Sequence, residues 1–123
     1  MDNKELVSTA ITAVFVNRDV SALDKYFDID YIQHNPQIPN GLEALRQLIK
    51  NLKTDFRYVP GIVTEAGEFV MIHGHYTGWA EKPMIAVDIF RIRNGKLAEH
   101  WDVMQEEITS DESINGNKMF PIN

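Results

Sequence analysis

Residues 85–104, IAVDIFRIRNGKLAEHWDVM, decide the fold, because apolar and polar side chains alternate on both sides of Asn94-Gly95. Alternation with a period of two predicts strands, and an Asn-Gly pair between two such runs predicts a β-hairpin. The same alternation runs upstream from Phe56, through RYVPGIVTEAG and EFVMIHGHYTGW. Turn residues at Ala66-Gly67 and from Ala80 to Pro83 separate these runs. We therefore expect four consecutive strands in an antiparallel meander.

The loop at Asn94-Gly95 decides which side chains share a face, because a slip of one residue turns a whole strand over. A two-residue type I′ turn would pair Arg93 with Lys96. In a regular ladder that register points the side chains of Asp88 and Asp102 to opposite faces of the sheet.

A three-residue loop from Arg93 to Gly95, with a bulge at the glycine, would instead pair Ile92 with Lys96. Asp88 then lies opposite His100, and both share a face with Asp102. We prefer this loop because it separates the two faces of the sheet. One face would hold six apolar residues, Ile85, Val87, Ile89, Leu97, Trp101 and Val103, and the other would hold the polar trio with Ala86, Phe90 and Met104.

Three helices are expected before the strands, because apolar residues there recur with a helical period after capping residues. The three are residues 3–17, with a capping box of Asp2 and Glu5; a short helix after Asp19, containing Leu23, Tyr26 and Phe27; and about residues 41–53, with a capping box of Asn40 and Glu43. The proline-containing segment YIQHNPQIPNG separates the last two.

Helices first and antiparallel strands afterwards describe an α+β domain whose helices lie on one face of a curved sheet. The hollow between such layers is where small molecules bind. The apolar outer face of the sheet predicts a homodimer that packs two such faces together. We expect one domain over residues 1–123, with its core at about residues 4–107 and a loosely held tail at residues 108–123.

The composition excludes several classes of function. The 123-residue chain carries 12 basic and 18 acidic residues, a net charge of -6, whereas nucleic acids and anionic membranes bind cationic surfaces. It has no cysteine, which excludes disulfides, a thiolate nucleophile and a zinc-finger site. The N-terminal residues lack a secretory pattern and no apolar run has membrane-spanning length, so we expect a cytoplasmic protein.

Two carboxylates and an imidazole, those of Asp88, Asp102 and His100, are the main candidates for chemistry. Burying them together is costly unless they hydrogen-bond to one another, and such clusters are enriched at functional sites. The structural alternative is a cross-strand pair of Asp88 and His100 that only satisfies itself. His34 and Asn35 either reach the same pocket or serve as turn formers.

Two segments resemble known proteins. DIFRIRNGKLAEHWDV, residues 88–103, resembles the signature hairpin of the SnoaL-like polyketide cyclases, and YIQHNP, residues 31–36, resembles the segment before their third helix. The resemblance covers about residues 4–107. It implies the cone-shaped α+β fold of the superfamily that includes nuclear transport factor two and ketosteroid isomerase.

The resemblance also implies an activity. A lyase or isomerase of this family needs no cofactor and removes a proton next to a carbonyl group, giving an enolate that closes a ring by aldol addition. Asp102 matches the aspartate that acts as general acid and base. The enolate needs a hydrogen-bond donor, and His100, His34 or a protonated Asp88 are the candidates.

The remaining candidates line the predicted pocket and leave two alternatives open. Phe90, Met104 and Trp79 are expected to contact substrate, together with Asn35, His73 and His75. Gly67, His73, His75 and Glu81 follow the spacing G-x5-H-x-H-x5-E, close to the first cupin motif, so the histidine pair could bind a divalent metal. We prefer no metal and no cofactor. A small-ligand-binding module without catalysis is the other alternative, because fold does not fix function.

Overall fold

The computed structural model describes all 123 residues and begins with the helix that the sequence predicts. Helix α1 (Asn3–Ile11) starts after Asp2, whose Oδ1 accepts a hydrogen bond from the Glu5 backbone amide at 2.8 Å. The helix continues into a π-helical turn, η1 (Thr12–Val16). The predicted helix over residues 3–17 is therefore confirmed to within one residue.

Helix α2 (Ser21–Tyr26) is the predicted short helix, and Oδ1 of Asp19 accepts a hydrogen bond from the Ser21 amide at 3.0 Å. Phe27 does not belong to it, because it opens an additional strand, β1 (Phe27–Gln33). Only Phe27 and Tyr31 are buried in this strand, whereas Ile29 is 83% exposed. The usual alternation of buried and exposed residues is therefore missing, which hides the strand in the sequence.

Helix α3 (Leu42–Lys50) is shorter than the predicted residues 41–53, and its capping box is wrong. Gly41 precedes the helix with a φ of 100°, and no side chain caps the helix start. The side chain of Asn40 turns the other way, where its Oδ1 accepts a hydrogen bond from the Gln33 amide at 2.8 Å. Asn40 thus ties the end of β1 to the loop before α3.

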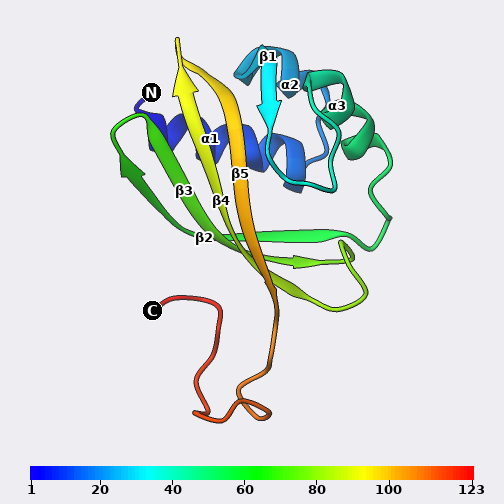
Figure 1. Cartoon of the computed structure of the whole chain (residues 1–123), viewed down its shortest axis with the longest axis vertical. Helices are drawn as coiled ribbons and strands as arrows, with labels where there is room; N and C mark the ends of the chain where they lie inside the picture. Colours follow the sequence, from blue (N-terminus) through cyan, green and yellow to red (C-terminus); the bar gives the residue numbers. More distant parts are fainter.

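The predicted meander of four strands is confirmed. The strands are β2 (Arg57–Ala66), β3 (Phe69–Thr77), β4 (Met84–Arg93) and β5 (Lys96–Glu106). The sheet order is β1-β5-β4-β3-β2, and β1 runs parallel to β5, so the sheet is mixed. Figure 1 shows the strands curving past α1, with α2 and α3 beside β1. The architecture is the expected α+β fold with its helices on one side of a curved sheet.

The turn between β4 and β5 is the two-residue turn, so the preferred three-residue loop is wrong. Arg93 pairs with Lys96, and Asn94 and Gly95 have φ angles of 52° and 72°. Two consecutive positive φ angles define a type I′ turn, for which Asn-Gly is the favoured pair.

A β-bulge then shifts the register within β5. Leu97 lies opposite Ile92, but Glu99 lies opposite Arg91, so Ala98 is an extra residue in the strand. A bulge turns every later side chain of the strand to the other face. Leu97, which precedes the bulge, therefore lies in the core and not on the outer face as predicted.

Beyond the bulge, the residues that were predicted to share a face do so. Asp88 lies opposite Asp102, and Phe90 lies opposite His100. All four side chains point to the concave side, where 21 buried residues form the core between sheet and helices. The prediction that Asp88 lies opposite His100 is wrong by one pair, because the bulge and not the loop sets the register.

The last residues of the chain form neither helix nor strand, and Figure 1 shows them leading away from the end of β5. Their Phe120 returns to the outer face of the sheet. Its ring lies 5.4 Å from that of His73 and 5.6 Å from that of His75, over Gly61. None of the helices is both long and apolar enough to cross a membrane.

Candidate functional site

A pocket opens between the concave face of the sheet and the helices. The empty space there is about 530 Å³ when the open solvent at its mouth is counted. Eleven of its 16 lining residues are hydrophobic. The five polar ones are Gln33, Asn35, Asp88, His100 and Asp102.

Asp88 and His100 form a buried pair on neighbouring strands. The imidazole Nε2 of His100 lies 2.7 Å from Oδ1 of Asp88, and each side chain is only 8% exposed. The other carboxylate oxygen of Asp88, Oδ2, accepts a hydrogen bond from the Tyr76 hydroxyl at 2.7 Å. Both oxygens of Asp88 are therefore occupied by protein groups.

Gln33 fixes which nitrogen of His100 carries a proton. The side-chain oxygen Oε1 of Gln33 accepts from the Asn35 backbone amide at 3.0 Å and lies 2.6 Å from Nδ1 of His100. An amide oxygen only accepts hydrogen bonds, so Nδ1 must donate. A further proton then bridges Nε2 and Asp88, held either by an imidazolium or by a carboxylic acid.

Asp102 is the carboxylate that the protein leaves open. Its Oδ2 accepts a hydrogen bond from Nδ2 of Asn35 at 2.7 Å and lies 3.8 Å from Nε2 of His100. Asn35 is oriented in turn, because its Oδ1 accepts from the Gln37 amide at 2.9 Å. Oδ1 of Asp102 is thus the oxygen available to a ligand, in a side chain that is 10% exposed.

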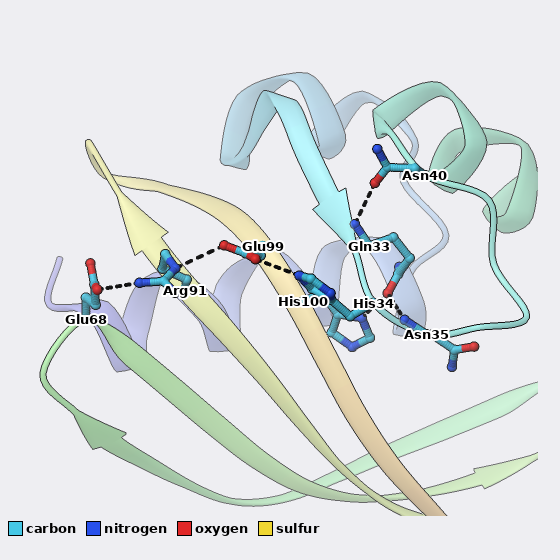
Figure 2. A network of polar contacts seen from close by, with 8 residues as sticks. All are labelled: Gln33, His34, Asn35, Asn40, Glu68, Arg91, Glu99 and His100. Atoms are coloured by element: carbon cyan, nitrogen blue, oxygen red, sulfur yellow. Dashed lines mark hydrogen bonds and ion pairs between the residues drawn. The ribbon is translucent and has the colours of Figure 1, made fainter.

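His34 lies outside the pocket, which corrects the prediction that it belongs to the catalytic group. Its Nε2 lies 2.6 Å from Oε2 of Glu99, and its ring stacks on Trp101 at 4.6 Å. Figure 2 follows this outer network from Glu68 through Arg91 and Glu99 to His34. Because Gln33 and Asn35 turn toward the pocket, the residue between them turns away from it.

The outer network perturbs the ionisation of Glu99. Hydrogen bonds from His34 and Arg91 lower the pKa of the Glu99 carboxyl, in that order of importance, against an opposing effect of burial. The guanidinium of Arg91 also lies over the ring of Phe69 at 4.6 Å. These groups brace the outer side of the strands that carry the pocket residues.

The structure divides the predicted lining residues between two faces. Phe90, Met104 and Trp79 line the pocket. His73 and His75 do not, because Ile72 and Tyr76 of the same strand are buried on the inner side and alternation sends the histidines outward. Their placement as substrate-binding residues is therefore corrected.

The potential metal ligands gather in the pocket and not at the predicted histidine pair. Nε2 of His75 lies 2.9 Å from Oε1 of Glu107. Asp88, His100 and Asp102 form the only group of three candidate ligands, with their atoms within 4.8 Å of one another. Gln33, Tyr76 and Asn35 hydrogen-bond to members of this group, and Oδ1 of Asp102 is its one ligand atom without a protein partner.

Three tyrosines complete the pocket, and the sequence predictions do not single them out. Tyr31, Tyr58 and Tyr76 all line it, and burial followed by the charge of Asp88 raises the pKa of each hydroxyl. All three are therefore neutral hydrogen-bond donors. The alternation of β2 and β3 could have placed Tyr58 and Tyr76 inside, whereas Tyr31 and Gln33 required knowledge of β1.

The fold and the site together define a cone-like α+β protein with a mainly apolar pocket and a buried aspartate–histidine pair. The family model of the SnoaL-like domain matches residues 8–100. The chain therefore belongs to the SnoaL-like family, which confirms the resemblance of its hairpin. No curated protein sequence matches the chain.

Several solved structures share the fold at low sequence identity. TsrD from Streptomyces laurentii is 21% identical, with a TM-score of 0.68 over 85% of this chain and 90% of its own. IdmH from Streptomyces antibioticus, a candidate polyketide cyclase, is 16% identical, with a TM-score of 0.66 over 85% and 92%. An NTF2-like protein of unknown function from Burkholderia xenovorans LB400 is 18% identical, with a TM-score of 0.69 over 85% and 83%.

Proposed function

We propose that the pocket binds a small carbonyl compound and that Asp102 removes a proton from the carbon next to the carbonyl group. Membership of the SnoaL-like family supports a cofactor-independent cyclase or isomerase type of chemistry. One observation carries the proposal for this chain. Asp102 lies in an apolar pocket with one oxygen held by Asn35 and the other left for a ligand.

The proposed reaction has two proton transfers. The C–H bond breaks as Oδ1 of Asp102 takes the proton, and the electron pair of that bond forms the enolate. The enolate carbon then attacks a second carbonyl carbon, and the new alkoxide takes the proton back from Asp102. The final product is an aldol, and if the enolate is conjugated to a C=C bond, return of the proton to its γ-carbon would instead give a positional isomer.

The buried pair of Asp88 and His100 has a positioning role in this proposal. Both nitrogens of His100 are engaged, by Gln33 and by Asp88, so the ring has no free N–H for substrate. Nε2 of His100 lies 3.8 Å from Oδ2 of Asp102, so the fixed imidazole ring borders the proposed base. The proposed reaction therefore does not require Asp88 to act as a second acid.

The test uses cyclohexanone as the probe. Its α-protons should exchange for deuterium faster with the protein than without it, as followed by proton NMR in D2O. Asp102→Asn should slow this exchange by about 100-fold or more, the usual contribution of a general base. Asp111→Asn, which removes an exposed carboxylate of the tail, is the matched control and should exchange at the wild-type rate.

Binding of cyclohexanone without accelerated exchange would contradict catalysis and favour the non-catalytic binding module. Equal exchange rates for the wild type and for Asp102→Asn would contradict the role of Asp102 in particular. A folded state of both variants, checked by circular dichroism, separates these outcomes from simple loss of structure.

We also propose that a second copy of the chain covers the outer face of the sheet. Val103 and Val59 lie on this face and are 70% and 49% exposed. Val87 of β4 lies opposite Val103, and it and Ile89 on the same face are partly exposed. Burial of these side chains against the same face of a second copy would remove an apolar surface from water.

A further inference from the structure

The hydroxyl of Tyr58 is the only buried side-chain polar atom of the pocket without a hydrogen-bond partner. Tyr58 is 5% exposed as a whole residue. Buried hydroxyls are nearly always paired in native proteins, so an unpaired one calls for an explanation. Tyr76 and His100 already occupy the two oxygens of Asp88, and the Tyr76 hydroxyl, although it acts against the rise in the Tyr58 pKa, does not satisfy hydrogen-bond geometry toward Tyr58.

The sequence around Tyr58 makes room for this hydroxyl. Tyr58 lies opposite Tyr76 in the ladder between β2 and β3, and its ring extends over Gly74. A Cβ atom at Gly74 would lie 2.7 Å from the Tyr58 oxygen and 2.5 Å from its ring. Any other residue at this position would displace the hydroxyl, so the glycine and the tyrosine form one built feature.

The hydroxyl keeps its proton. Burial, and then the charge of Asp88, raises the pKa of Tyr58 well above its ordinary value. The group is thus a neutral O–H donor throughout the physiological range, and no protein acceptor lies in good hydrogen-bond geometry to it.

The pocket lining therefore contains a free acceptor and hydroxyls without a protein partner, of which that of Tyr58 lies beneath the pocket surface and that of Tyr31 is the other. Oδ1 of Asp102 accepts and Tyr58 donates, and the walls around them are mainly apolar. A carbonyl compound needs this pair of groups, an acceptor for the α-proton and a donor for the oxygen on which negative charge develops.

We infer that Tyr58 donates a hydrogen bond to the carbonyl oxygen of the ligand and stabilises the enolate that forms there. The stabilisation of an enolate rests on the proposed function, whereas the hydrogen bond to a carbonyl ligand does not. Tyr58 thus takes the role of hydrogen-bond donor to the enolate, for which the sequence analysis named His100, His34 or a protonated Asp88 as candidates.

The ligand oxygen must displace a neighbouring side chain to reach the hydroxyl, because no water-sized space lies against that atom. The side chain of Phe15 is placed to move aside. It packs edge-on against the Tyr58 ring at 6.3 Å, lines the same pocket and is partly exposed. It also belongs to the π-helical turn η1, and such turns often mark functional sites.

The experiment compares cyclohexanone with methylenecyclohexane, which replaces the carbonyl oxygen by a CH2 group of similar size. Tyr58→Phe should weaken the binding of cyclohexanone about tenfold and leave that of methylenecyclohexane unchanged, because only the ketone accepts a hydrogen bond. The infrared C=O stretch of bound cyclohexanone should lie at higher frequency in Tyr58→Phe than in the wild type. Tyr26→Phe, which removes a hydroxyl outside the pocket, should change neither quantity.

A second variant keeps the Tyr58 hydroxyl but moves it from its place. Gly74→Ala should reproduce the selective loss of ketone affinity, because the new methyl group pushes the Tyr58 ring aside. Urea denaturation of each variant confirms that it is folded before binding is measured.

Three results would overturn the inference. They are failure of the wild type to bind cyclohexanone, an equal loss of affinity for both compounds in Tyr58→Phe, and an unchanged C=O stretch. The proposed function fails separately, if a ketone that Tyr58 demonstrably binds shows no accelerated proton exchange. If proton exchange is equally fast in Tyr58→Phe, Tyr58 does not stabilise the enolate, although Asp102 can still be the base.

Discussion

Asp88 lies directly opposite Asp102 across β4 and β5, although the hairpin that joins these strands turns in two residues. A regular ladder from that turn would send the two carboxylates to opposite faces of the sheet. The extra residue Ala98 reverses the face of everything that follows it. The composition of the pocket therefore depends on one residue that contributes no polar group of its own.

Deletion of Ala98 tests this dependence. Without the bulge, His100 and Asp102 would turn to the outer face and Trp101 would turn into the core, so we expect loss of cooperative thermal unfolding. Circular dichroism measures the transition. The wild type should give an NMR contact between the α-protons of Asp88 and Asp102. A deletion variant that keeps that contact and the wild-type melting temperature would contradict the bulge.

The features that could be predicted from the sequence are those that local patterns determine. Alternation gave four strands, Asp2 gave the start of α1, and Asn94-Gly95 favours the turn that is present. The bulge at Ala98 could not be predicted, because the residues around it carry no turn signal. The grouping of Asp88 with Asp102 was correct for a different physical reason than the one that suggested it.

The site was harder to predict where it depended on contacts between distant segments. β1 pairs with β5 and buries only Phe27 and Tyr31. Because its residues do not alternate between buried and exposed, the sequence of β1 does not predict a strand. Without that strand the directions of Gln33 and His34 could not be assigned. One of them orients His100 and the other lies outside the pocket.

Tyr76→Phe should destabilise the protein by about 1–3 kcal/mol, because it leaves Oδ2 of the buried Asp88 without a donor. The ring is retained, so the packing against Tyr58 and Phe56 is unchanged. Urea denaturation at neutral pH measures the difference in the free energy of unfolding. Tyr26→Phe is the control, and an equal effect in both variants would show that the hydrogen bond to Asp88 has no special importance.

Val103→Glu should convert a dimer into a monomer if two copies pack through the outer face of the sheet. The side chain is 70% exposed in one chain, so a charge there is tolerated by the monomer but not by an apolar interface. Light scattering after size exclusion gives the mass of the particle, with Ile114→Glu in the tail as control. A wild type that is monomeric at all concentrations would refute the proposed dimer.

Phe120→Ala should free the C-terminal tail from the outer face. The aromatic ring packs on His73 and His75 and fills the space above Gly61. Trypsin should then cut faster after Lys118, because a released segment fits a protease active site more readily. Gly61→Ala should also release the tail, because its new Cβ would lie 2.8 Å from the ring of Phe120, and at 2.6 Å from the His73 backbone oxygen it should disturb the pairing of β2 with β3 as well. Unchanged cleavage in both variants would show that Phe120 does not anchor the tail.

Glu99 should make the protein sensitive to acid. His34 first, and then Arg91, lower the pKa of Glu99 below its ordinary value of 4.5 in the folded state. Between the folded and unfolded pKa values the unfolded chain binds more protons, so stability rises with pH there. The stabilisation is complete above about pH 4.5 and is lost as the pH falls through the folded-state pKa.

Glu99→Gln removes this ionisation and provides the test. Wild-type protein should be more stable than the variant at neutral pH, and the difference should shrink as the pH falls from about 7 to about 3. Urea midpoints across that range measure it. Glu112→Gln, at an exposed tail position without an ion pair, is the matched control. A constant difference between wild type and Glu99→Gln at every pH would mean that the contacts of Glu99 with His34 and Arg91 do not depend on its charge.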